Sequence, residues 1–574
     1  MNLSTSRPIL WAKRHWHTIL VVLAAIGFFF VASSFNYLSQ DNAFVKWLSP
    51  DETANYTVAR LYAQTGSLQF FEKYNLIAED IIHPRSFRSD WGWIKPVSFV
   101  GMPLYYGAIG RLLGIDVIPY LTPLFGAIAL IFFYLLIREF FGKTNALMST
   151  VLAAAFPVYV YFSARSMFHN ILFIAALIIG LYFVVRMVRR RPPEEGGYLS
   201  RTWPSFLYAL LGGAAFGVAA AARTSELLWL APLLVGLWLF NFRKVGLVKL
   251  FFFAYGIFLA LLPVMFWNQT LFGSWKSSGY PELNDSLFTL EQSGGALAQT
   301  AAAGKWYDIG PALAKVQDTV FHFGFHPGQS LHIFDDYVTT MFPWLFWLAG
   351  AGILLFIIYY KKYTRGRWLF FLGWAAVSTI LVIYYGSWLF FDNPDQTSTI
   401  GNSYTRYWLP LYLGALPFVS LIIIFATSVL RQRHVIAVAR AIAVAALVTV
   451  SIQFVWNDPA EGIAVSIEKQ KQSRLEWEQV TALTEPNAVI ITRYHDKLLF
   501  SERKVVIGLF NDKNMIRAYA RIARYIPVYY YNFNYQQKDL EYLNSSPLHE
   551  AGLRIEEVKR ITDRFTLYRL ILAP

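Results

Sequence analysis

The chain contains no cysteine. This excludes a disulfide framework, thiolate chemistry and a cysteine-based metal site, and it leaves the cellular compartment open. Charged residues are also scarce, at 15% of 574 residues, while 56% are hydrophobic. Many apolar runs reach about 20 residues, which is the length that spans the hydrocarbon core of a bilayer. The composition therefore predicts a polytopic, multi-pass α-helical membrane protein.

The formal net charge of +14 does not indicate nucleic acid, because no nucleic-acid motif accompanies it. The basic residues concentrate in short loops between apolar segments, where they set orientation by the positive-inside rule. Arg7, Lys13 and Arg14 precede the first apolar run, so we expect the N-terminus in the cytoplasm. We expect about eleven transmembrane helices and a C-terminus on the outer side. The expected spans are residues 18–37, 117–137, 146–162, 171–188, 206–222, 227–240, 247–267, 341–360, 368–390, 408–430 and 435–455.

The segment 97–114 decides this orientation, because it is apolar but short, and contains Pro103 and several glycines. If it does not cross, the basic clusters that follow the later spans all lie in the cytoplasm. If it crosses, all of them lie outside, against the positive-inside rule. We therefore expect residues 38–116 to form an outer loop of a transmembrane domain that covers residues 1–456.

The composition changes after the last span, from residue 457 to residue 574. Short strand-like runs at 488–492, 504–508, 528–531 and 564–572 alternate with helical patterns. This alternation predicts a small extracytoplasmic α/β domain. It has no glycine-rich phosphate loop and no nucleophile elbow, so we expect no catalytic residues there.

An acidic pair, Asp51-Glu52, lies just beyond the outer end of the first span. It begins a short helix that we expect to lie along the membrane surface, through Arg60, and to stop at Thr65-Gly66-Ser67. Carboxylates at a helix N-terminus also suit a cap and the helix dipole. A structural role for the pair therefore stands beside a catalytic one.

Other polar residues gather in the segments that face outward. Arg223 and Glu226 could line a polar cavity, or they could form an i, i+3 ion pair that closes a helical hairpin. Arg165 is also in this group, and we expect His169 to be an interfacial cap. The pocket candidates are His83, Asp90, Arg223, Glu226, Tyr404 and Tyr280.

The acidic pair, the helix through Arg60, Lys95-Pro96 and the run Arg406-Tyr-Trp-Leu-Pro410 resemble the pattern of polytopic GT-C glycosyltransferases. The branch is the one that includes protein O-mannosyltransferases and lipid A aminoarabinose transferases, and the resemblance covers roughly residues 1–430. It implies a polyprenyl-phosphate sugar donor, inversion at the anomeric carbon, and a pocket between the first outer loop and the membrane. It matches Asp51 to the catalytic carboxylate, Lys95 to a donor-phosphate contact, and Arg406 to a second cation.

The chain departs from this family pattern in two places. The family's Lys-Pro-Pro or His-Pro-Pro is Lys95-Pro96-Val97 here, and His83-Pro84-Arg85 precedes it, so either element could take that place. The surface helix lacks the family's frequent early arginine and has only Arg60.

We therefore predict a membrane glycosyltransferase that moves a sugar from a polyprenyl-phosphate donor to an acceptor hydroxyl on a protein, lipid or glycan. Asp51 and Glu52 are the predicted catalytic carboxylates, because a positioned acid can accept the proton of the attacking hydroxyl. Lys95, Arg406 and Arg60 are the predicted contacts of the departing phosphate. We expect the reaction at the extracytoplasmic face of the cell membrane.

No sequence feature requires a cofactor. Asp51, Glu52 and a phosphate would make an oxygen-rich site that could hold Mg²⁺ or Mn²⁺. His322, His326 and His332 do not have metal-ligand spacing on a recognisable scaffold, so we do not expect zinc there.

The alternative class is a transporter or flippase of a lipid-linked or small polar substrate. A transporter should show broken helices near mid-membrane and often an internal repeat. The chain shows no repeat, and its polar residues cluster at one face of the membrane, so an enzyme is favoured.

Overall fold

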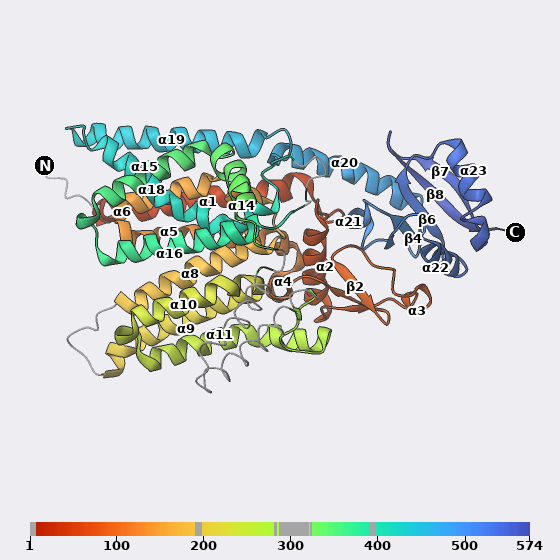
Figure 1. The fold of residues 1–574 in the computed structure, drawn as a ribbon, viewed down its shortest axis with the longest axis horizontal. Coiled ribbons are helices and arrows are strands. Elements are labelled where there is room, and N and C mark those ends of the chain that lie inside the picture. The colour runs from red at the N-terminus through yellow and green to blue at the C-terminus, as the bar shows by residue number, and fades with distance from the viewer. Residues whose placement is uncertain are drawn as a thin grey trace. The chain divides into compact units, whose positions relative to one another are not determined.

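The computed structural model describes residues 7–189, 198–280, 284–285, 321, 324–390, 392 and 397–573, with side chains from residue 15 and, after the first gap, from residue 203. The chain divides into two compact units, which we describe separately (Figure 1). Unit 1 comprises residues 1–34, 120–266 and 281–465, and unit 2 comprises residues 35–119, 267–280 and 466–574. Residues 38–116, which the sequence predicts to be an outer loop, thus group with the C-terminal α/β region rather than with the helical bundle.

Long apolar helices dominate the chain. Within the described residues, eight helices are long and apolar enough to cross a membrane. This confirms the predicted class of a polytopic helical membrane protein. These helices are α1 (Arg7–Ser39), α5 (Ile118–Phe141), α8 (His169–Arg189), α9 (Tyr198–Ala222), α11 (Phe242–Phe272), α16 (Arg365–Gly386), α18 (Leu409–Thr427) and α19 (Arg433–Asn457).

Two further expected spans, 146–162 and 341–360, lie in helix pairs that bend at a proline, and the second of them covers only the later helix of its pair. Helices α6 (Lys143–Ala155) and α7 (Pro157–Ala164) meet at 50°, and the segment 327–340 meets α15 (Pro343–Ile358) at 99°. That segment consists of α14 (Pro327–Phe334) and the π-helix η4 (Asp335–Thr340). Phe156 is extended, with ψ of 124°, because a following proline disfavours helical geometry.

The remaining expected span is the shorter apolar helix α10 (Leu227–Phe240). All eleven expected spans therefore coincide with helices. Within the described residues, up to ten segments are long and apolar enough to cross a membrane if each bent pair counts as one span, and α10 is shorter than these.

Small residues allow α9 and α11 to pack closely. A Cβ on Gly213 would overlap the carbonyl oxygen of Phe253, and one on Gly256 would overlap that of Leu210. Such close backbone approach is typical of small-residue helix interfaces in membranes. The spacing of Gly213 and Gly217 thus serves helix packing.

The outer loop of unit 2 folds into helices around a small antiparallel sheet of order β1-β3-β2. Trp91 and Gly92 both have positive φ, as a tight two-residue hairpin requires, and they join β2 to β3. The elements are α2 (Pro50–Thr65), β1 (Phe70–Phe71), α3 (Asn75–Ala78), β2 (Phe87–Asp90), β3 (Trp93–Pro96) and α4 (Gly101–Leu113).

Helix α4 occupies the segment that decided the predicted orientation. It has 13 residues. At 1.5 Å per residue it is about 20 Å long, which is shorter than the hydrocarbon core of a bilayer. It is not among the membrane-length helices of the described residues, and the expectation that this segment does not cross stays a prediction.

The C-terminal region forms a five-stranded sheet of order β5-β4-β6-β8-β7, which confirms the predicted α/β fold. Strand β4 runs parallel to β5 and β6, whereas β8 runs antiparallel to β6 and β7. All four residues of β4 are buried, as expected for a parallel strand covered on both faces. The elements are α20 (Ile463–Ala482), β4 (Val489–Thr492), α21 (Asp496–Leu499), β5 (Lys504–Ile507), α22 (Lys513–Ala523), β6 (Val528–Phe533), α23 (Gln537–Ser545), β7 (Leu553–Arg560) and β8 (Phe565–Leu572).

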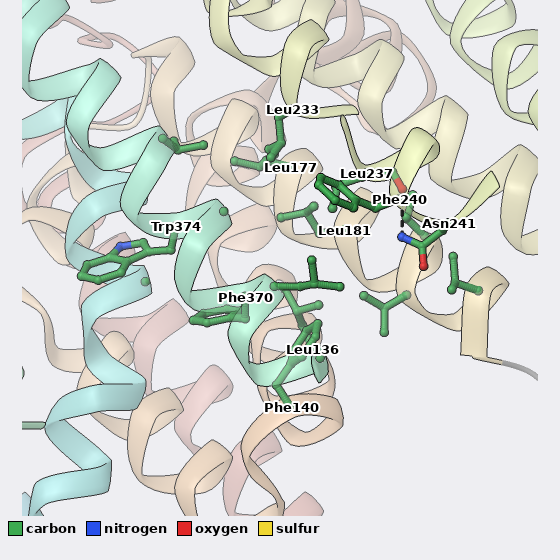
Figure 2. Close-up of a pocket in the computed structure, with 18 of the residues that line it drawn as sticks. Leu136, Phe140, Leu177, Leu181, Leu233, Leu237, Phe240, Asn241, Phe370 and Trp374 are labelled. Carbon is green, nitrogen blue, oxygen red and sulfur yellow. Dashed lines mark hydrogen bonds between the residues drawn. The ribbon is translucent and has the colours of Figure 1, made fainter. Parts of the chain in front are cut away.

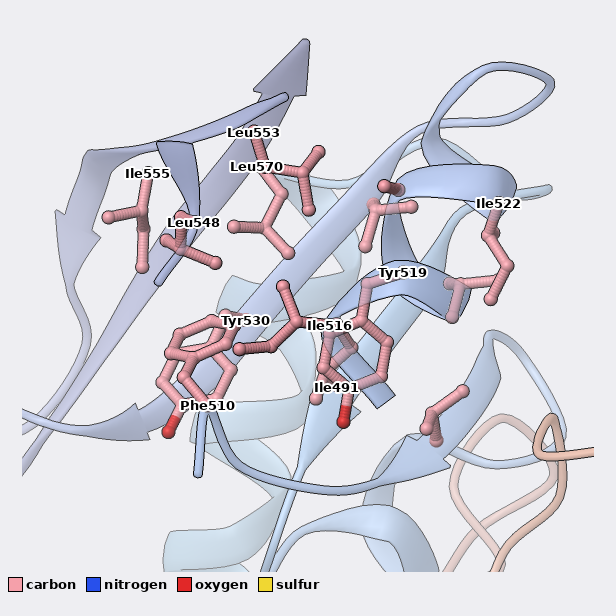
Figure 3. Close-up of a cluster of buried hydrophobic side chains, with 14 of the residues drawn as sticks. Ile491, Phe510, Ile516, Tyr519, Ile522, Tyr530, Leu548, Leu553, Ile555 and Leu570 are labelled. Carbon is pink, nitrogen blue, oxygen red and sulfur yellow. The ribbon is translucent and has the colours of Figure 1, made fainter. Parts of the chain in front are cut away.

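One face of this sheet packs against α22, whose Ile516, Tyr519 and Ile522 point into the apolar core with Tyr530 of β6 (Figure 3). The opposite face carries Tyr531, whose hydroxyl donates a 3.0 Å hydrogen bond to Glu476 of α20. The alternation along β6 therefore places the sheet between two helices.

The core of the α/β region also includes residues of the first outer loop. Ala78 and Ile82 are buried in the same cluster as Ile491 and Val506. At the rim, Lys504 pairs with Glu72 at 2.7 Å. Unit 2 therefore holds the loop and the α/β region together through a shared apolar core.

Candidate functional site

The two carboxylates at the start of α2 have different environments. Glu52 is fully buried, and its Oε2 accepts a 3.0 Å hydrogen bond from the backbone N–H of Ser49. Together with Ser49 it forms a capping box, so it satisfies the helix N-terminus. Asp51 is only partly buried, and its Oδ1 accepts a 2.6 Å hydrogen bond from the hydroxyl of Ser86. The described residues supply no hydrogen bond to its second oxygen, so Asp51 is the carboxylate of the pair that is open to a ligand.

Ser86 connects Asp51 to the strand that carries Lys95. The backbone N–H of Val97 donates to the carbonyl of Ser86 at 3.0 Å, and Arg88 lies opposite Lys95 in the hairpin. The acid and the lysine therefore lie on directly joined elements of unit 2.

Lys95 is held by two partners within unit 2. Its ammonium pairs with Asp90 at 2.7 Å and donates to the carbonyl of Leu271 at 2.7 Å. Arg88 also pairs with Asp90, at 3.2 Å. Lys95, Arg88 and Asp90 thus form a cluster in which two cations share one carboxylate. The formal net charge of this cluster is positive.

Asp80 fixes the hairpin that presents this cluster, and nothing in the sequence singled it out. Its carboxylate accepts hydrogen bonds from the hydroxyl of Ser89 at 2.6 Å and from the N–H groups of Trp91 and Gly92 at 2.9 and 2.8 Å. Burial by itself would raise the pKa of Asp80, but these hydrogen bonds outweigh it and lower the pKa below its usual 3.8. The ionised form of Asp80 therefore stabilises the turn.

The predicted candidate Tyr280 lies beside the continuation of β3. Its ring centroid is 5.3 Å from that of Phe99, and a Cβ on the neighbouring Gly279 would overlap the backbone of Val97. The absence of a side chain at Gly279 therefore allows this segment to approach the strand that carries Lys95.

The sequence left open whether His83-Pro84-Arg85 or Lys95-Pro96-Val97 takes the family position. Arg85 binds the fully buried carboxylate of Asp496, with Nε 3.0 Å from Oδ1 and the backbone N–H 2.9 Å from Oδ2. His83 Nδ1 lies 3.0 Å from the carbonyl of Pro84, and its backbone bridges to Val506 of β5. His83-Pro84-Arg85 thus contacts the α/β region. Lys95 instead lies on the strand that is joined to Asp51 through Ser86.

Arg60 lies on α2 close to Lys46. Burial lowers the pKa of Lys46, Glu502 opposes this effect, and the positive charge of Arg60 adds to it. The structure therefore places Arg60 in the electrostatic surroundings of a buried lysine.

Arg223 and Glu226, in unit 1, form the i, i+3 ion pair that the sequence offered as one alternative. Arg223 Nε donates to Glu226 Oε1 at 2.9 Å. The hydroxyl of Tyr385 also donates to Oε1, at 2.6 Å, and Trp229 Nε1 donates to Oε2 at 2.5 Å. All these side chains are buried, so Glu226 is satisfied by three donors within the bundle.

Arg406 lies next to a second arginine that the sequence did not assign to the site. The guanidinium carbons of Arg406 and Arg165 lie 4.6 and 5.7 Å from the ring centroid of Phe168. Arg406 donates to the hydroxyl of Ser403 at 2.7 Å, and Arg165 donates to that of Tyr161 at 2.9 Å. The only sequence signal for Arg165 was an arginine in an outward turn between apolar helices.

Arg406 also lies near the buried ion pair of Arg223 and Glu226. The guanidinium carbon of Arg223 lies 4.4 Å from the ring centroid of Tyr407, the neighbour of Arg406. The candidate Tyr404 is buried, and its hydroxyl donates to the carbonyl of Trp388 at 2.6 Å. Unit 1 thus gathers three arginines around aromatic rings, and Tyr404 supports the fold beside them.

The described residues do not converge on a metal. Among them, no group of three histidine, aspartate or glutamate side chains could hold an ion. Glu52 points to its own helix cap, and His332 lies 3.3 Å from Asp336. His322 lies outside the described residues. The predicted pair Asp51 and Glu52 therefore does not fit a metal site, and we derive no step through a metal.

Comparison with known proteins bears on the fold and the class. A family model described as dolichyl-phosphate-mannose-protein mannosyltransferase matches residues 113–267. ArnT from Cupriavidus metallidurans in the apo state shares 13% identity with a TM-score of 0.54, over 97% of this chain and 98% of that chain. Its structure bound to undecaprenyl phosphate shares 12% identity with a TM-score of 0.51, over the same fractions. The fold is that of the GT-C glycosyltransferases.

A second GT-C relative has the same fold. The archaeal oligosaccharyltransferase AglB from Archaeoglobus fulgidus, in complex with an inhibitory peptide and a dolichol-phosphate, shares 13% identity with a TM-score of 0.53, over 95% of this chain and 70% of that chain. No curated protein sequence matches the chain. The family match and the GT-C fold support the predicted class, a membrane glycosyltransferase with a lipid-phosphate-linked sugar donor. The family match includes Arg165, Arg223 and Glu226, but it includes neither Asp51 nor Arg406.

Proposed function

We propose that the chain transfers a sugar from a polyprenyl-phosphate donor to a hydroxyl of a protein, lipid or glycan acceptor, with inversion at the anomeric carbon. The GT-C fold and the mannosyltransferase family match support this class of reaction. The observation that carries the residue assignment is the contrast at the start of α2, where Glu52 is buried in its cap and Asp51 keeps one carboxylate oxygen open.

Asp51 is the proposed general base. It accepts the proton of the acceptor hydroxyl while that oxygen attacks the anomeric carbon. The bond from this carbon to the phosphate oxygen breaks, and its electrons leave with the lipid phosphate. A single displacement of this kind inverts the anomeric centre. Glu52 acts as a positioning residue, because it caps the helix that presents Asp51.

Arg165 and Arg406 are proposed to bind a phosphate of the donor in unit 1. Guanidinium groups present planar pairs of N–H donors that match phosphate oxygens, and they stack on aromatic rings. Phe168 holds both arginines on such a ring. In unit 2, Lys95 is proposed as a further phosphate contact, positioned by Asp90, and Arg60 as a contributor of positive charge.

We also propose that the N-terminus is cytoplasmic and that the α/β region faces the extracytoplasmic side of the cell membrane. The basic residues that follow α5, α8 and α10 support this orientation through the positive-inside rule. The shortness of α4 supports the same parity.

A transfer assay with the purified full-length chain tests the proposal. The donor is a short polyprenyl phosphate that carries a labelled sugar, and an alcohol or peptide hydroxyl is the acceptor. We expect Asp51→Asn to lower turnover by about 10²–10⁴-fold, which is the usual contribution of a general base. Asp116→Asn is the matched control, because Asp116 is an exposed acid of the same unit. Equal turnover of the wild type and Asp51→Asn would remove Asp51 as the base.

A further inference from the structure

Unit 1 contains an apolar cavity that the proposed reaction does not use. Its volume is about 730 Å³, and it lies between α5, α8, α10, α16 and α18. Leu136, Leu177, Leu181, Leu233 and Phe370 point into it from these helices (Figure 2). The cavity is therefore bordered by apolar helices, is partly open to the outside, and is walled mostly by hydrocarbon.

An apolar molecule is expected to fill the apolar part of this cavity. A buried water needs two to four polar partners, which the leucine and phenylalanine side chains of the apolar part do not provide. The volume lies within the range of about 300–1,000 Å³ that is usual for ligand sites. In a bilayer, the acyl chains of lipids are the molecules that can fill it.

One end of the cavity is basic. The lining side chains there are Arg189, Arg243, Lys244 and Arg365. Arg189 lies at the end of α8, Arg243 and Lys244 at the start of α11, and Arg365 at the start of α16. Asn241 lies at the same end and donates to the carbonyl of Leu237 at 2.8 Å (Figure 2).

Within the described residues, most of this positive charge has no ion-pair partner. Arg189 pairs with Glu139 at 3.4 Å, whereas no ion pair is recorded within the described part of the chain for Arg243, Lys244 or Arg365. A hydrocarbon cavity with an uncompensated cationic end is complementary to a molecule that has an apolar tail and an anionic head.

We propose that this cavity binds an anionic phospholipid, with an acyl chain among the leucines and the phosphate at Arg243, Lys244 and Arg365. The site is distinct from the proposed donor-phosphate site. Helix α16 begins at Arg365, and Tyr385, which contacts Glu226, is near its other end. Twenty residues of helix separate the two ends by about 30 Å, so one phosphate cannot serve both.

Native mass spectrometry of the purified, delipidated full-length chain measures this binding directly. The probes are phosphatidylglycerol and phosphatidylcholine with identical acyl chains. We expect the wild type to bind phosphatidylglycerol at least about tenfold more tightly, since two to three lysine or arginine contacts with an anionic head contribute roughly 1 kcal/mol each. The double variant Arg243→Gln/Lys244→Gln should lose this preference. Lys361→Gln/Lys362→Gln, which alters basic residues that do not line the cavity, should keep it.

A second pair of variants tests the cavity itself. A Cβ on Gly373 would meet only Leu233 Cδ1, at 4.0 Å, so Gly373→Leu starts a side chain in open space and narrows the cavity. We expect this variant to weaken binding of both phospholipids. The control is Gly350→Leu, because a Cβ there meets nothing within 4 Å and Gly350 does not line the cavity.

Two results would overturn the proposal. One is equal binding of the two phospholipids by the wild type. The other is displacement of phosphatidylglycerol by a polyprenyl phosphate at equal concentration, which would assign the cavity to the donor lipid. Asp51→Asn should bind phosphatidylglycerol as the wild type does, so the lipid site is tested independently of transfer.

Discussion

The hydroxyl of Ser86 donates a 2.6 Å hydrogen bond to the carboxylate of Asp51. The carbonyl of the same serine accepts from the backbone N–H of Val97 at 3.0 Å, and Val97 directly follows the strand that carries Lys95. Helix α2 and the hairpin of β2 and β3 are therefore joined at the acid itself. Because Asp51 is also held from outside its own helix, its position depends on the folded loop as well as on the helix cap.

The first prediction separates the two carboxylates. Glu52→Gln should retain transfer within a few-fold of the wild type and should unfold at nearly the same temperature, because glutamine can also close a capping box. Glu52→Ala opens the box and should cost about 1 kcal/mol or more of unfolding free energy. The measurement is turnover together with thermal unfolding of each variant. A large loss of turnover in a well-folded Glu52→Gln protein would make Glu52 part of the catalytic chemistry.

The second prediction concerns Arg406. Lysine keeps the charge but neither the planar fork nor the stacking on Phe168, so Arg406→Lys should raise the donor KM by about tenfold. Arg165→Lys should have an effect of similar size, since both arginines use the same ring. Arg440→Lys serves as the control, because Arg440 binds the hydroxyl of Thr427 instead. Unchanged donor KM in both site variants would contradict the proposed phosphate contact.

The third prediction concerns the attachment of the outer loop to the α/β region. Arg85→Ala leaves the buried carboxylate of Asp496 without its charged partner, so unit 2 should lose about 1–3 kcal/mol of unfolding free energy. Lys513→Ala removes an ion pair whose two side chains are mostly exposed, and it should change stability by less than about 1 kcal/mol. Thermal unfolding in detergent compares the two variants, and similar shifts would show that the Arg85 pair does not hold the loop.

The fourth prediction is a pH dependence at Asp80. Because its pKa is lowered in the folded protein, the ionised form binds the turn more strongly than the protonated form does. Its stabilisation should be complete above the ordinary pKa of 3.8 and should disappear as the pH falls through the lower folded value. The difference in melting temperature between the wild type and Asp80→Asn should therefore be constant at neutral pH and shrink below that value. Asp563→Asn, at an exposed position, should show no such change.

The fifth prediction concerns metal removal. Glu52 is held by the cap, and no group of three ligand side chains converges among the described residues, so the proposed reaction assigns no role to an ion. Transfer by the purified chain should therefore survive EDTA and should not rise when Mg²⁺ or Mn²⁺ is added. Loss of turnover in EDTA with recovery on adding one of these ions would contradict the assignment.

The amino-acid sequence determined the membrane class, the positions of the helices and the α/β character of the C-terminal region. These features follow from local patterns, because a span is an apolar run of a fixed length and a strand alternates or is continuously apolar. Proline also acts locally, which explains the bends before Pro157 and Pro343.

Only the tertiary structure decided how the polar residues divide their roles. Asp51 and Glu52 are neighbours with the same chemistry, and they differ because Ser86, 35 residues away, reaches only one of them. Arg85 and its partner Asp496 are 411 residues apart, so no local pattern could join the outer loop to the α/β region. Contacts at such separations depend on the packing of the whole core, whereas helix and strand periodicity depends on a few neighbouring residues.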